Sequence, residues 1–595
     1  MPEESNAPSG ITRRDALKLG VAAGAAASVA AIVGTTPAEA AAPTDLNEAT
    51  IAQLQAAMHS GGLTSSHLVD FYLSRIRALD QGTTGVNSVL ELNPAAGEIA
   101  RDLDAERRRK GPRGPLQGIP VLLKDNVDTG DSMQTAAGSL ALVGRPAHRD
   151  STLVKNLREA GAVILGKTNL SEWANFRSTS SSSGWSGRGG QCNNPYFIDF
   201  NPCGSSSGSA ASVSANFTAV GIGTETDGSI VCPANVSGVV GLKPTIGLVS
   251  RAGVVPISHT QDSPGPHGRT VADVAVVLGA IQSKTFDGRD AATGGVPLGW
   301  TGTGRARPTN IPSDYTRFLN GDGLRGARLG LWAAGSANAS PKEAAAFSAA
   351  QAAILAAGAT LVTFDFPHAA DINSGNAEFL ILLYDFKLDL QIYLADRTGV
   401  PIHTLADAIA FNSAHAAAEL PWFGQEIFEL AQAMDTSSPD APQPLFGGMS
   451  YNQALAMDRL IGGVEGIDQV LRDNNLDAIV AATANISWAT DLVNGDRPSF
   501  FGASTPPAIV GYPIISVPMA LVKGLPLGIS FFGTAFSEPT LIKLASGFEQ
   551  VTKARSAPKF IAEIGLNPQL DSSDHGDQGG DHQHRPDLTK RPAMI

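Results

Sequence analysis

Residues 221–245 read GIGTETDGSIVCPANVSGVVGLKPT, with Ser229 inside the segment TETDGSI. Glycine, aspartate and serine are common in turns, so this segment alone predicts only a glycine-containing turn. Twenty-four residues before Ser229, Ser205 lies in NPCGSSSGSAAS, residues 201–212. A glycine- and serine-rich run of that kind is, on its own, typical of a linker. Neither segment indicates a function without a third one.

The third segment is GIPVLLKDN, residues 118–126, which ends a run of apolar residues at Lys124. Apolar residues on both faces predict a buried strand. A lysine there is usually a simple strand-end charge, but burial lowers a lysine pKa from about 10.4 and frees the neutral amine to act as a base. The order and spacing of the three segments argue against a chance combination.

Together these segments resemble the amidase-signature family, whose members use two serines and a lysine. GKTNLSEWANF (166–176), GLKPTIGLVSR (241–251) and DSPGPHGRTVAD (262–273) also resemble segments of that family, and the similarity extends from about residue 45 to about residue 560. The resemblance implies an α/β fold, with a single α/β/α domain whose central mixed β-sheet is covered by helices on both faces.

The resemblance implies a role for each matching residue. Ser229 would be the nucleophile, Lys124 the base, and Ser205, after a cis peptide bond, the proton relay between them. An acyl intermediate on Ser229 would divide a difficult amide hydrolysis into two easier steps. No metal and no organic cofactor is implied. The backbone N–H groups implied for the oxyanion hole are those of Thr226, Asp227, Gly228 and Ser229.

The substrate is indicated by segments outside the triad. SEWANFRS (171–178), GWSGRGGQ (184–191) and FGQEIFE (423–429) resemble the bacterial peptide amidases of the family, which implies C-terminal amides of peptides. Many family members carry an arginine two or three residues after the nucleophile, suited to a substrate carboxylate. Val231 and Cys232 stand there instead, which disfavours malonamate-like acids and the amidase component of a glutaminyl-tRNA amidotransferase. Two alternatives remain, namely a general aliphatic or aryl amidase and a catalytically silent amide-binding relative.

Two shorter motifs suggest other enzymes. GAVILGKT (161–168) matches the phosphate-loop pattern of nucleotide-binding proteins. A helix is predicted before Gly161 and a strand after it, which inverts the order that a phosphate loop requires. The pattern G-x-S-x-G at 204–208 fits a nucleophile elbow. The preceding PYFIDFNPC is a poor strand, so neither interpretation is favoured.

The first forty residues have the layout of an export signal. Arg13 and Arg14 precede an Ala/Gly/Val stretch at 19–34, and small residues at 38–40 favour cleavage before Ala41. The paired arginines resemble a twin-arginine leader, which implies the twin-arginine export machinery as a partner and a secreted or periplasmic enzyme. No later apolar run is long enough to span a membrane.

These features divide the chain into a signal peptide at 1–40, a catalytic domain at 41–565 and a polar tail at 566–595. The composition of the tail predicts disorder, with weak metal binding by His575, His582 and His584 as the alternative. The Gly/Pro/Thr-rich segment 288–313 is either a domain boundary or a surface loop. The sequence leaves the oligomeric state open.

The charge and the cysteine content argue against further functional and structural classes of protein. The formal net charge of −13 gives no support for binding nucleic acid or an anionic membrane, which require basic patches. Cys192, Cys203 and Cys232 allow at most one disulfide and lack metal-ligand spacing. We therefore expect them to be small buried apolar residues, although Cys232 falls near the predicted chemistry.

Secondary-structure patterns agree with an α/β fold. Two helices are predicted within 44–80, separated by a Gly-Gly break. A capped helix at 151–161 is followed by a β-branched run, and a second capped helix at 340–358 precedes the strand TLVTFDF. Helices alternating with strands predict a largely parallel or mixed sheet.

Overall fold

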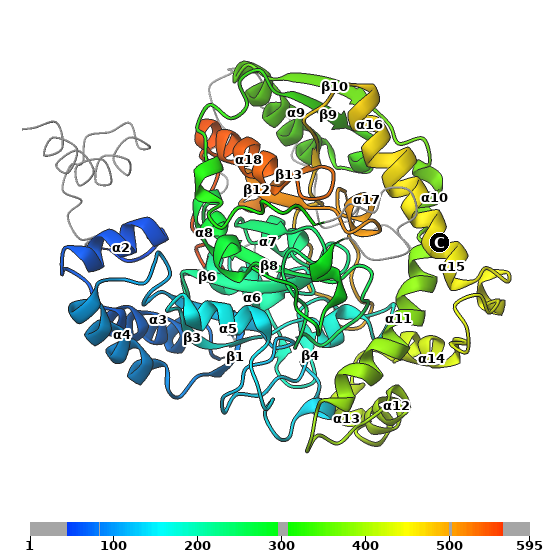
Figure 1. The fold of residues 1–595 in the computed structure, drawn as a ribbon, viewed down its shortest axis with the longest axis horizontal. Helices are drawn as coiled ribbons and strands as arrows, with labels where there is room; N and C mark the ends of the chain where they lie inside the picture. Colours follow the sequence, from blue (N-terminus) through cyan, green and yellow to red (C-terminus); the bar gives the residue numbers. More distant parts are fainter. Residues whose placement is uncertain (1–44, 83, 296–306, 499–501, 563–595) are drawn as a thin grey trace, which may run out of the picture.

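The computed structural model describes residues 45–82, 84–295, 307–498 and 502–562. Within them, eleven strands form one sheet, with helices packed against both of its faces (Figure 1). The predicted leader and the whole of the predicted tail lie outside the described residues. In spatial order the strands are β1 (Val89–Leu92), β3 (Val163–Thr168), β2 (Pro120–Lys124), β6 (Val220–Glu225), β8 (Ser263–Gly268), β7 (Val240–Lys243), β12 (Ile514–Val522), β13 (Leu525–Phe532), β11 (Ala478–Ala482), β9 (Arg328–Trp332) and β10 (Thr360–Phe364).

The sheet is mixed. Strand β2 runs parallel to β3 and β6 on its two sides, and β9 runs parallel to β11 and β10. The other neighbouring pairs are antiparallel. Val121 pairs with Val220, and Leu123 pairs with Ile222. Because parallel strands end at the same edge of a sheet, Lys124 and the loop after β6 emerge side by side.

Helices cover the two faces of the sheet. On one face lie α5 (Thr152–Glu159), α8 (Val271–Ile281), α9 (Pro341–Ala356) and α18 (Glu538–Thr552). The other face carries α6 (Ser207–Ser214), α7 (Val231–Val236), α16 (Asp468–Asp473), α17 (Thr505–Ala508) and a π-helical segment at Arg459–Ile467. Strand β11 shows the alternation, because Ala478 and Val480 face the first layer and Ile479 and Ala481 the second.

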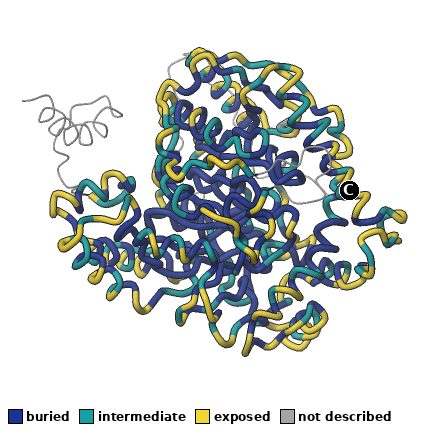
Figure 2. Tube along the Cα trace, in the orientation of Figure 1, coloured by how far each residue is buried: buried dark blue, intermediate teal, exposed yellow. Residues whose placement is uncertain are grey.

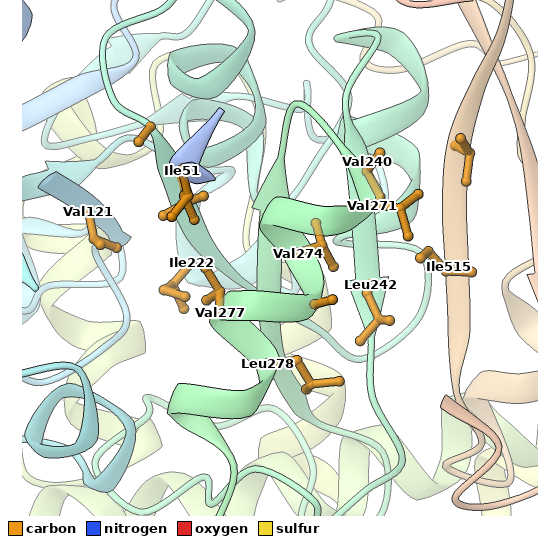
Figure 3. Close-up of a cluster of buried hydrophobic side chains, with 14 of the residues drawn as sticks. Ile51, Val121, Ile222, Val240, Leu242, Val271, Val274, Val277, Leu278 and Ile515 are labelled. Carbon is orange, nitrogen blue, oxygen red and sulfur yellow. The ribbon is translucent and has the colours of Figure 1, made fainter. Parts of the chain in front are cut away.

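The largest apolar cluster lies between the sheet and the first helical layer. Val274, Val277 and Leu278 of α8 approach Ile222 of β6 and Leu242 of β7 in Figure 3. All five side chains are fully buried, and the buried trace runs through the centre of the molecule in Figure 2. Burial of apolar surface at about 25 cal/mol per Å² is the main stabilising contribution in such a core.

A second apolar cluster forms beside the sheet around α11 (Asn376–Ala395). Trp173 and Phe176, from the chain after β3, pack into it, so it joins the peripheral helices to the centre of the molecule. Figure 1 shows these helices along one side of the sheet. The remaining helices of this group are α12 (Leu405–Ala414), α13 (Ala416–Glu419), α14 (Glu426–Ala433) and α15 (Tyr451–Asp458). Helix α10 (Ala369–Ser374) packs against α17 and the π-helical segment instead. Helices α2 (Ile51–His59), α3 (Ser65–Leu79) and α4 (Ala96–Lys110) lie at the side of the molecule that carries β1 and β3 (Figure 1).

The α/β architecture with a mixed central sheet is confirmed. Helices α2 and α3 form within 44–80, and α5 is followed by β3. Ser340 and Glu343 form the capping box of α9, which precedes β10. Strands before and after the segment 288–313 belong to the same sheet. No helix among the described residues has both the length and the apolar character that a membrane crossing requires.

Candidate active site

Lys124 is the last residue of β2, and its side chain is completely buried. Its Nζ donates a hydrogen bond to Ser205 Oγ at 2.8 Å. It also donates to Thr224, to Oγ1 at 2.9 Å and to the carbonyl oxygen at 3.2 Å. The structure therefore brings the predicted lysine and the first predicted serine into direct contact, although 81 residues separate them.

The surroundings of Lys124 change its protonation. Burial lowers the pKa of Lys124 from 10.5 to about 7, and the negative charges of Asp262 and Glu225 oppose this shift only in part. At pH 7 about half of the molecules then hold a neutral amine at this position. Only the neutral amine has a lone pair that can accept a proton.

Ser205 lies in the turn before α6, and the peptide bond between Gly204 and Ser205 is cis. A Cβ atom at Gly204 would lie 2.1 Å from Ser171 Oγ, so only glycine fits there without a rearrangement. Ser206 N–H donates to the carbonyl oxygen of Ser229 at 3.1 Å, which joins this turn to the loop after β6. Ser205 is thus held between Lys124 and the Ser229 loop.

The loop after β6 carries Ser229. Glu225, the last residue of β6, accepts hydrogen bonds at Oε2 from Ile230 N–H at 2.6 Å and Val231 N–H at 2.9 Å. These bonds fold the loop back toward its own strand. Gly228 has a φ of 75°, a left-handed conformation that glycine adopts without steric cost. The turn presents Ser229 at the surface of a cavity, with 8% of the residue exposed.

This loop also contains four consecutive backbone N–H groups without a hydrogen-bond partner among the described residues. They are the N–H groups of residues 226–229. All four residues line the same cavity as Ser229. Donors clustered at a cavity stabilise a negative charge that develops on a bound molecule, because they are oriented before it forms.

Two side-chain contacts hold this loop in place. Thr226 Oγ1 donates to Asp262 Oδ1 at 2.6 Å, and Thr505 Oγ1 donates to Asp227 Oδ2 at 2.7 Å. Asp262 Oδ2 in turn accepts from the backbone of Ile257 at 2.8 Å. The loop is therefore fixed to segments far from it in sequence, which limits its movement when a substrate binds.

The cavity has a volume of about 300 Å³. Phe176, Ile257 and Leu382 give it apolar walls, and Asp227 and Asp496 add two carboxyl groups. Burial raises the pKa of both carboxyl groups, although several hydrogen bonds oppose the shift. No lysine or arginine belongs to the described residues that line the cavity. An apolar pocket with a few polar groups is typical of a small-molecule site.

The structure corrects the expectation for the cysteines. Cys203 and Cys232 form a disulfide, and only Cys192 is a free buried thiol among the described residues. The disulfide connects the turn that carries Ser205 to the helix that follows Ser229, and both cysteines line the cavity. Spacing alone could not reveal it, because the two residues are brought together by the approach of α6 and α7.

The alternative motifs are also resolved by the structure. In GAVILGKT, residues 163–168 form strand β3, so the segment contains no phosphate-binding turn, and the nucleotide-binding interpretation is wrong. Lys167 is buried and donates to the carbonyl oxygen of Val127 at 2.7 Å. The elbow interpretation is wrong as well. Ser206, the nucleophile that this pattern requires, is buried, and its Oγ donates to the Thr224 carbonyl oxygen at 3.0 Å. No strand leads directly into the turn that carries it.

Several residues of the site were not singled out from the sequence. Glu225 and Asp262 hold the loop, and Asp496 lies in the cavity wall. Glu225 stands inside TETDGSI and Asp262 begins DSPGPHGRTVAD, so both could have been noticed. Asp496 lies in none of the quoted segments and is not distinguishable in the sequence from a surface charge. Asn175 was also missed, although it lies in the quoted segment GKTNLSEWANF. Its backbone has a left-handed conformation, and its side chain lines the cavity together with residues that are far from it in the sequence.

The described residues that line the cavity include no group of side chains with the spacing of metal ligands. Among the described residues, one group of side chains has ligand atoms close enough for a metal ion, namely His259, Asp385 and Asp389. None of the three lines the cavity. The groups available for chemistry are the Ser229 hydroxyl and the backbone donors at the cavity, together with the Ser205 hydroxyl and the Lys124 amine next to that loop.

The sequence model of the Amidase family matches residues 67–542, and the chain belongs to this family of amide-hydrolysing enzymes. A probable amidase of Arabidopsis thaliana is 41% identical over 528 residues, which cover 87% of this chain and 92% of the relative. One component of the glutamyl-tRNA(Gln) amidotransferase of Halorhodospira halophila is 30% identical, over 85% of this chain and 98% of the relative.

Two solved structures of amidases are also similar to this chain in sequence and in fold. The native peptide amidase from Stenotrophomonas maltophilia is 46% identical, with a TM-score of 0.77 over 86% of this chain and 99% of that chain. An amidase family protein from Bacillus anthracis is 34% identical, with a TM-score of 0.73 over 86% of this chain and 92% of that chain.

Proposed function

We propose that this enzyme hydrolyses the C-terminal carboxamide of peptides to a carboxylate and ammonia, through an acyl intermediate on Ser229. In this proposal Lys124 is the base, Ser205 passes protons, and the N–H groups of residues 226–229 form the oxyanion hole. The observation that carries it is the 2.8 Å hydrogen bond between Lys124 Nζ and Ser205 Oγ, beside the loop that presents Ser229 to the cavity.

The first step is acylation. The Ser229 hydroxyl attacks the amide carbonyl carbon, its proton passes to Ser205, and the Ser205 proton passes to the neutral amine of Lys124. The tetrahedral intermediate then collapses, the C–N bond breaks, and the leaving nitrogen takes a proton back along the same route and departs as ammonia. Lys124 ends the step neutral, with Ser229 held as an ester.

The oxyanion is stabilised by the loop itself. The carbonyl oxygen becomes negative as Ser229 attacks, and the unpartnered N–H groups of residues 226–229 are available to donate to it. Loss of one such donor typically costs 10² to 10³ in rate. Water then attacks the ester in the second step, with Lys124 and Ser205 as base and relay, and releases the carboxylate.

The preference for a peptide amide rests on the cavity wall. Asn175 Oδ1 accepts a hydrogen bond from Ser181 Oγ at 2.7 Å, which orients the amide group. Its Nδ2 has no acceptor among the described residues and is therefore free to donate to a substrate peptide carbonyl. The 46% identity to a peptide amidase of known structure also supports a peptide amide as the substrate.

The charge of the wall supports a neutral substrate. Asp227 and Asp496 disfavour a molecule with a carboxylate near the scissile amide, and no described lysine or arginine in the wall compensates for it. A C-terminally amidated peptide has no such carboxylate, whereas its hydrolysis product has one. Repulsion then assists release of the product.

Ammonia release from a blocked, C-terminally amidated dipeptide tests the proposal, run beside a simple aliphatic amide and an aryl amide. We expect release from the peptide amide, lost in Ser229→Ala. Release from the simple or aryl amides alone would keep the amidase chemistry and discard the peptide substrate. Turnover that persists in Ser229→Ala would place the nucleophile elsewhere.

We also propose export by the twin-arginine route, which rests on the leader at 1–40. The disulfide between Cys203 and Cys232 supports an oxidising compartment, since such bonds are rare where thiols are kept reduced. Cell fractionation tests it. Wild type should reach the periplasm or medium, and the double variant Arg13→Lys, Arg14→Lys should stay in the cytoplasm. Equal export of the two proteins would contradict the proposed route.

A further inference from the structure

A second cluster of polar side chains lies at His259, in the loop 257–262 that also contributes Ile257 to the cavity wall. His259 in this loop faces Asp385 and Asp389, which are one turn apart on α11 and share a face of that helix. His259 Nδ1 is 3.0 Å from Asp389 Oδ2 and 3.5 Å from Asp385 Oδ1. The three ligand atoms all lie within 4.8 Å of one another.

The Asp385 carboxylate supplies the second observation. Its side chain is fully buried, and its Oδ1 accepts no hydrogen bond among the described residues although it faces His259. Its Oδ2 is oriented by Ser258 Oγ at 2.6 Å and Thr260 Oγ1 at 2.9 Å. A buried carboxylate oxygen that accepts no hydrogen bond and has a 3.5 Å ion pair with an imidazole is incompletely compensated, so this position favours a cation.

Charges of both signs surround the cluster. Arg251 approaches His259 and donates to its carbonyl oxygen, but its guanidinium is paired with Asp290. Arg459 lies close enough to Asp385 to interact with it electrostatically. Asp262 adds a further carboxylate to the same groove, which has a volume of about 420 Å³ and also contains Asp389 and His259.

We propose that His259, Asp385 and Asp389 bind one divalent transition-metal ion, for which Zn²⁺ is the probe. One imidazole nitrogen and two carboxylate oxygens form a donor set that Zn²⁺, Mn²⁺ and Co²⁺ accept. With Zn²⁺ bonds of about 2.0–2.2 Å, donors in a tetrahedral site lie roughly 3.3–3.6 Å apart. The two separations from His259 Nδ1 are 3.0 and 3.5 Å, and all three ligand atoms lie within 4.8 Å of one another. His259 is half exposed, which leaves the remaining position to water.

The ion would tie α11 to the loop that supports the cavity. Ile257 lines the cavity, and Asp262 accepts the Thr226 hydroxyl. The proposed site therefore has a structural role next to the catalytic loop and takes no part in the bond-breaking steps. It does not depend on the proposed function, because metal binding is measured without a substrate.

Calorimetric titration of the metal-stripped full chain with Zn²⁺ tests the proposal. The background variant has alanine at His575, His582 and His584, so that the C-terminal histidines do not contribute. We expect one equivalent of Zn²⁺ and a higher melting temperature in its presence. Both effects should disappear in His259→Ala and in Asp389→Asn.

His368→Ala is the matched control. His368 is a partly exposed histidine that also lies beside two carboxylates, with Nε2 at 2.7 Å from Glu465 and Nδ1 at 3.7 Å from Asp371. Its variant should keep the equivalent of Zn²⁺. Unchanged binding in folded His259→Ala and Asp389→Asn, or no binding in the background variant, would overturn the proposal and leave the cluster as an ion pair of a protonated histidine.

Discussion

The activity should depend on pH through Lys124. With the pKa of Lys124 lowered to about 7 by burial, the neutral fraction is about 0.9 at pH 8, about 0.5 at pH 7 and about 0.1 at pH 6. We therefore expect kcat/KM to fall about tenfold between pH 8 and pH 6, because only the neutral amine accepts the proton. An exposed lysine would be neutral in only about one molecule in 3,000 at pH 7.

The assay is ammonia release from a blocked, amidated dipeptide at substrate concentrations well below KM. A blocked peptide has no titratable group, so the profile reports the free enzyme. Lys243 is the control for the assignment. It is also buried, with its pKa lowered by burial to about 8, but its Nζ donates to the Tyr512 carbonyl oxygen at 2.6 Å and contacts neither serine. Lys243→Met should keep the acid limb near pH 7.

Two results would refute this reasoning. A kcat/KM that continues to rise tenfold per pH unit up to pH 10 would mean that Lys124 keeps an ordinary pKa and is not desolvated. A folded Lys124→Ala protein that keeps both the wild-type rate and the acid limb would remove this lysine from the reaction, whatever its pKa.

Three further perturbations follow from the geometry. Gly204→Ala should lower the free energy of unfolding by about 1–3 kcal/mol and reduce turnover, because its Cβ would lie 2.1 Å from Ser171 Oγ; an unchanged melting temperature would contradict this contact. Replacing Cys203 and Cys232 by serine should lower the free energy of unfolding by about 3–4 kcal/mol, since the crosslink spans 29 residues. Denaturant titration checks this value, and wild type under reducing agent should match the variant. Asn175→Ala should raise KM for the peptide amide about fivefold through loss of one hydrogen bond, with little effect on acetamide; an equal effect on both would assign Asn175 a structural role.

Much of the fold was predictable from local patterns. The capped helices α5 and α9 and the apolar strand β2 are determined by neighbouring residues, because capping and apolar periodicity act over a few positions. The phosphate-loop match at 161–168 could be rejected on the same basis, since a helix before the glycine and a β-branched run after it are both local features.

The cysteines and the cavity wall were not predictable in this way. Cys203 and Cys232 meet because α6 and α7 pack together on one face of the sheet, and nothing near either cysteine records that contact. Asp496 and Asn175 line one cavity although more than 300 residues separate them. Contacts of this kind arise from chain topology, which local propensity does not encode.

The sequence by itself determined the α/β elements, the family resemblance and the identity of Lys124, Ser205 and Ser229 as candidates, because these depend on residue type and order along the chain. Only the tertiary structure decided that Lys124 loses its water and contacts Ser205. Its low pKa arises when β3, β6 and the turn before α6 enclose the amine, and desolvation is a property of all the atoms that surround a group.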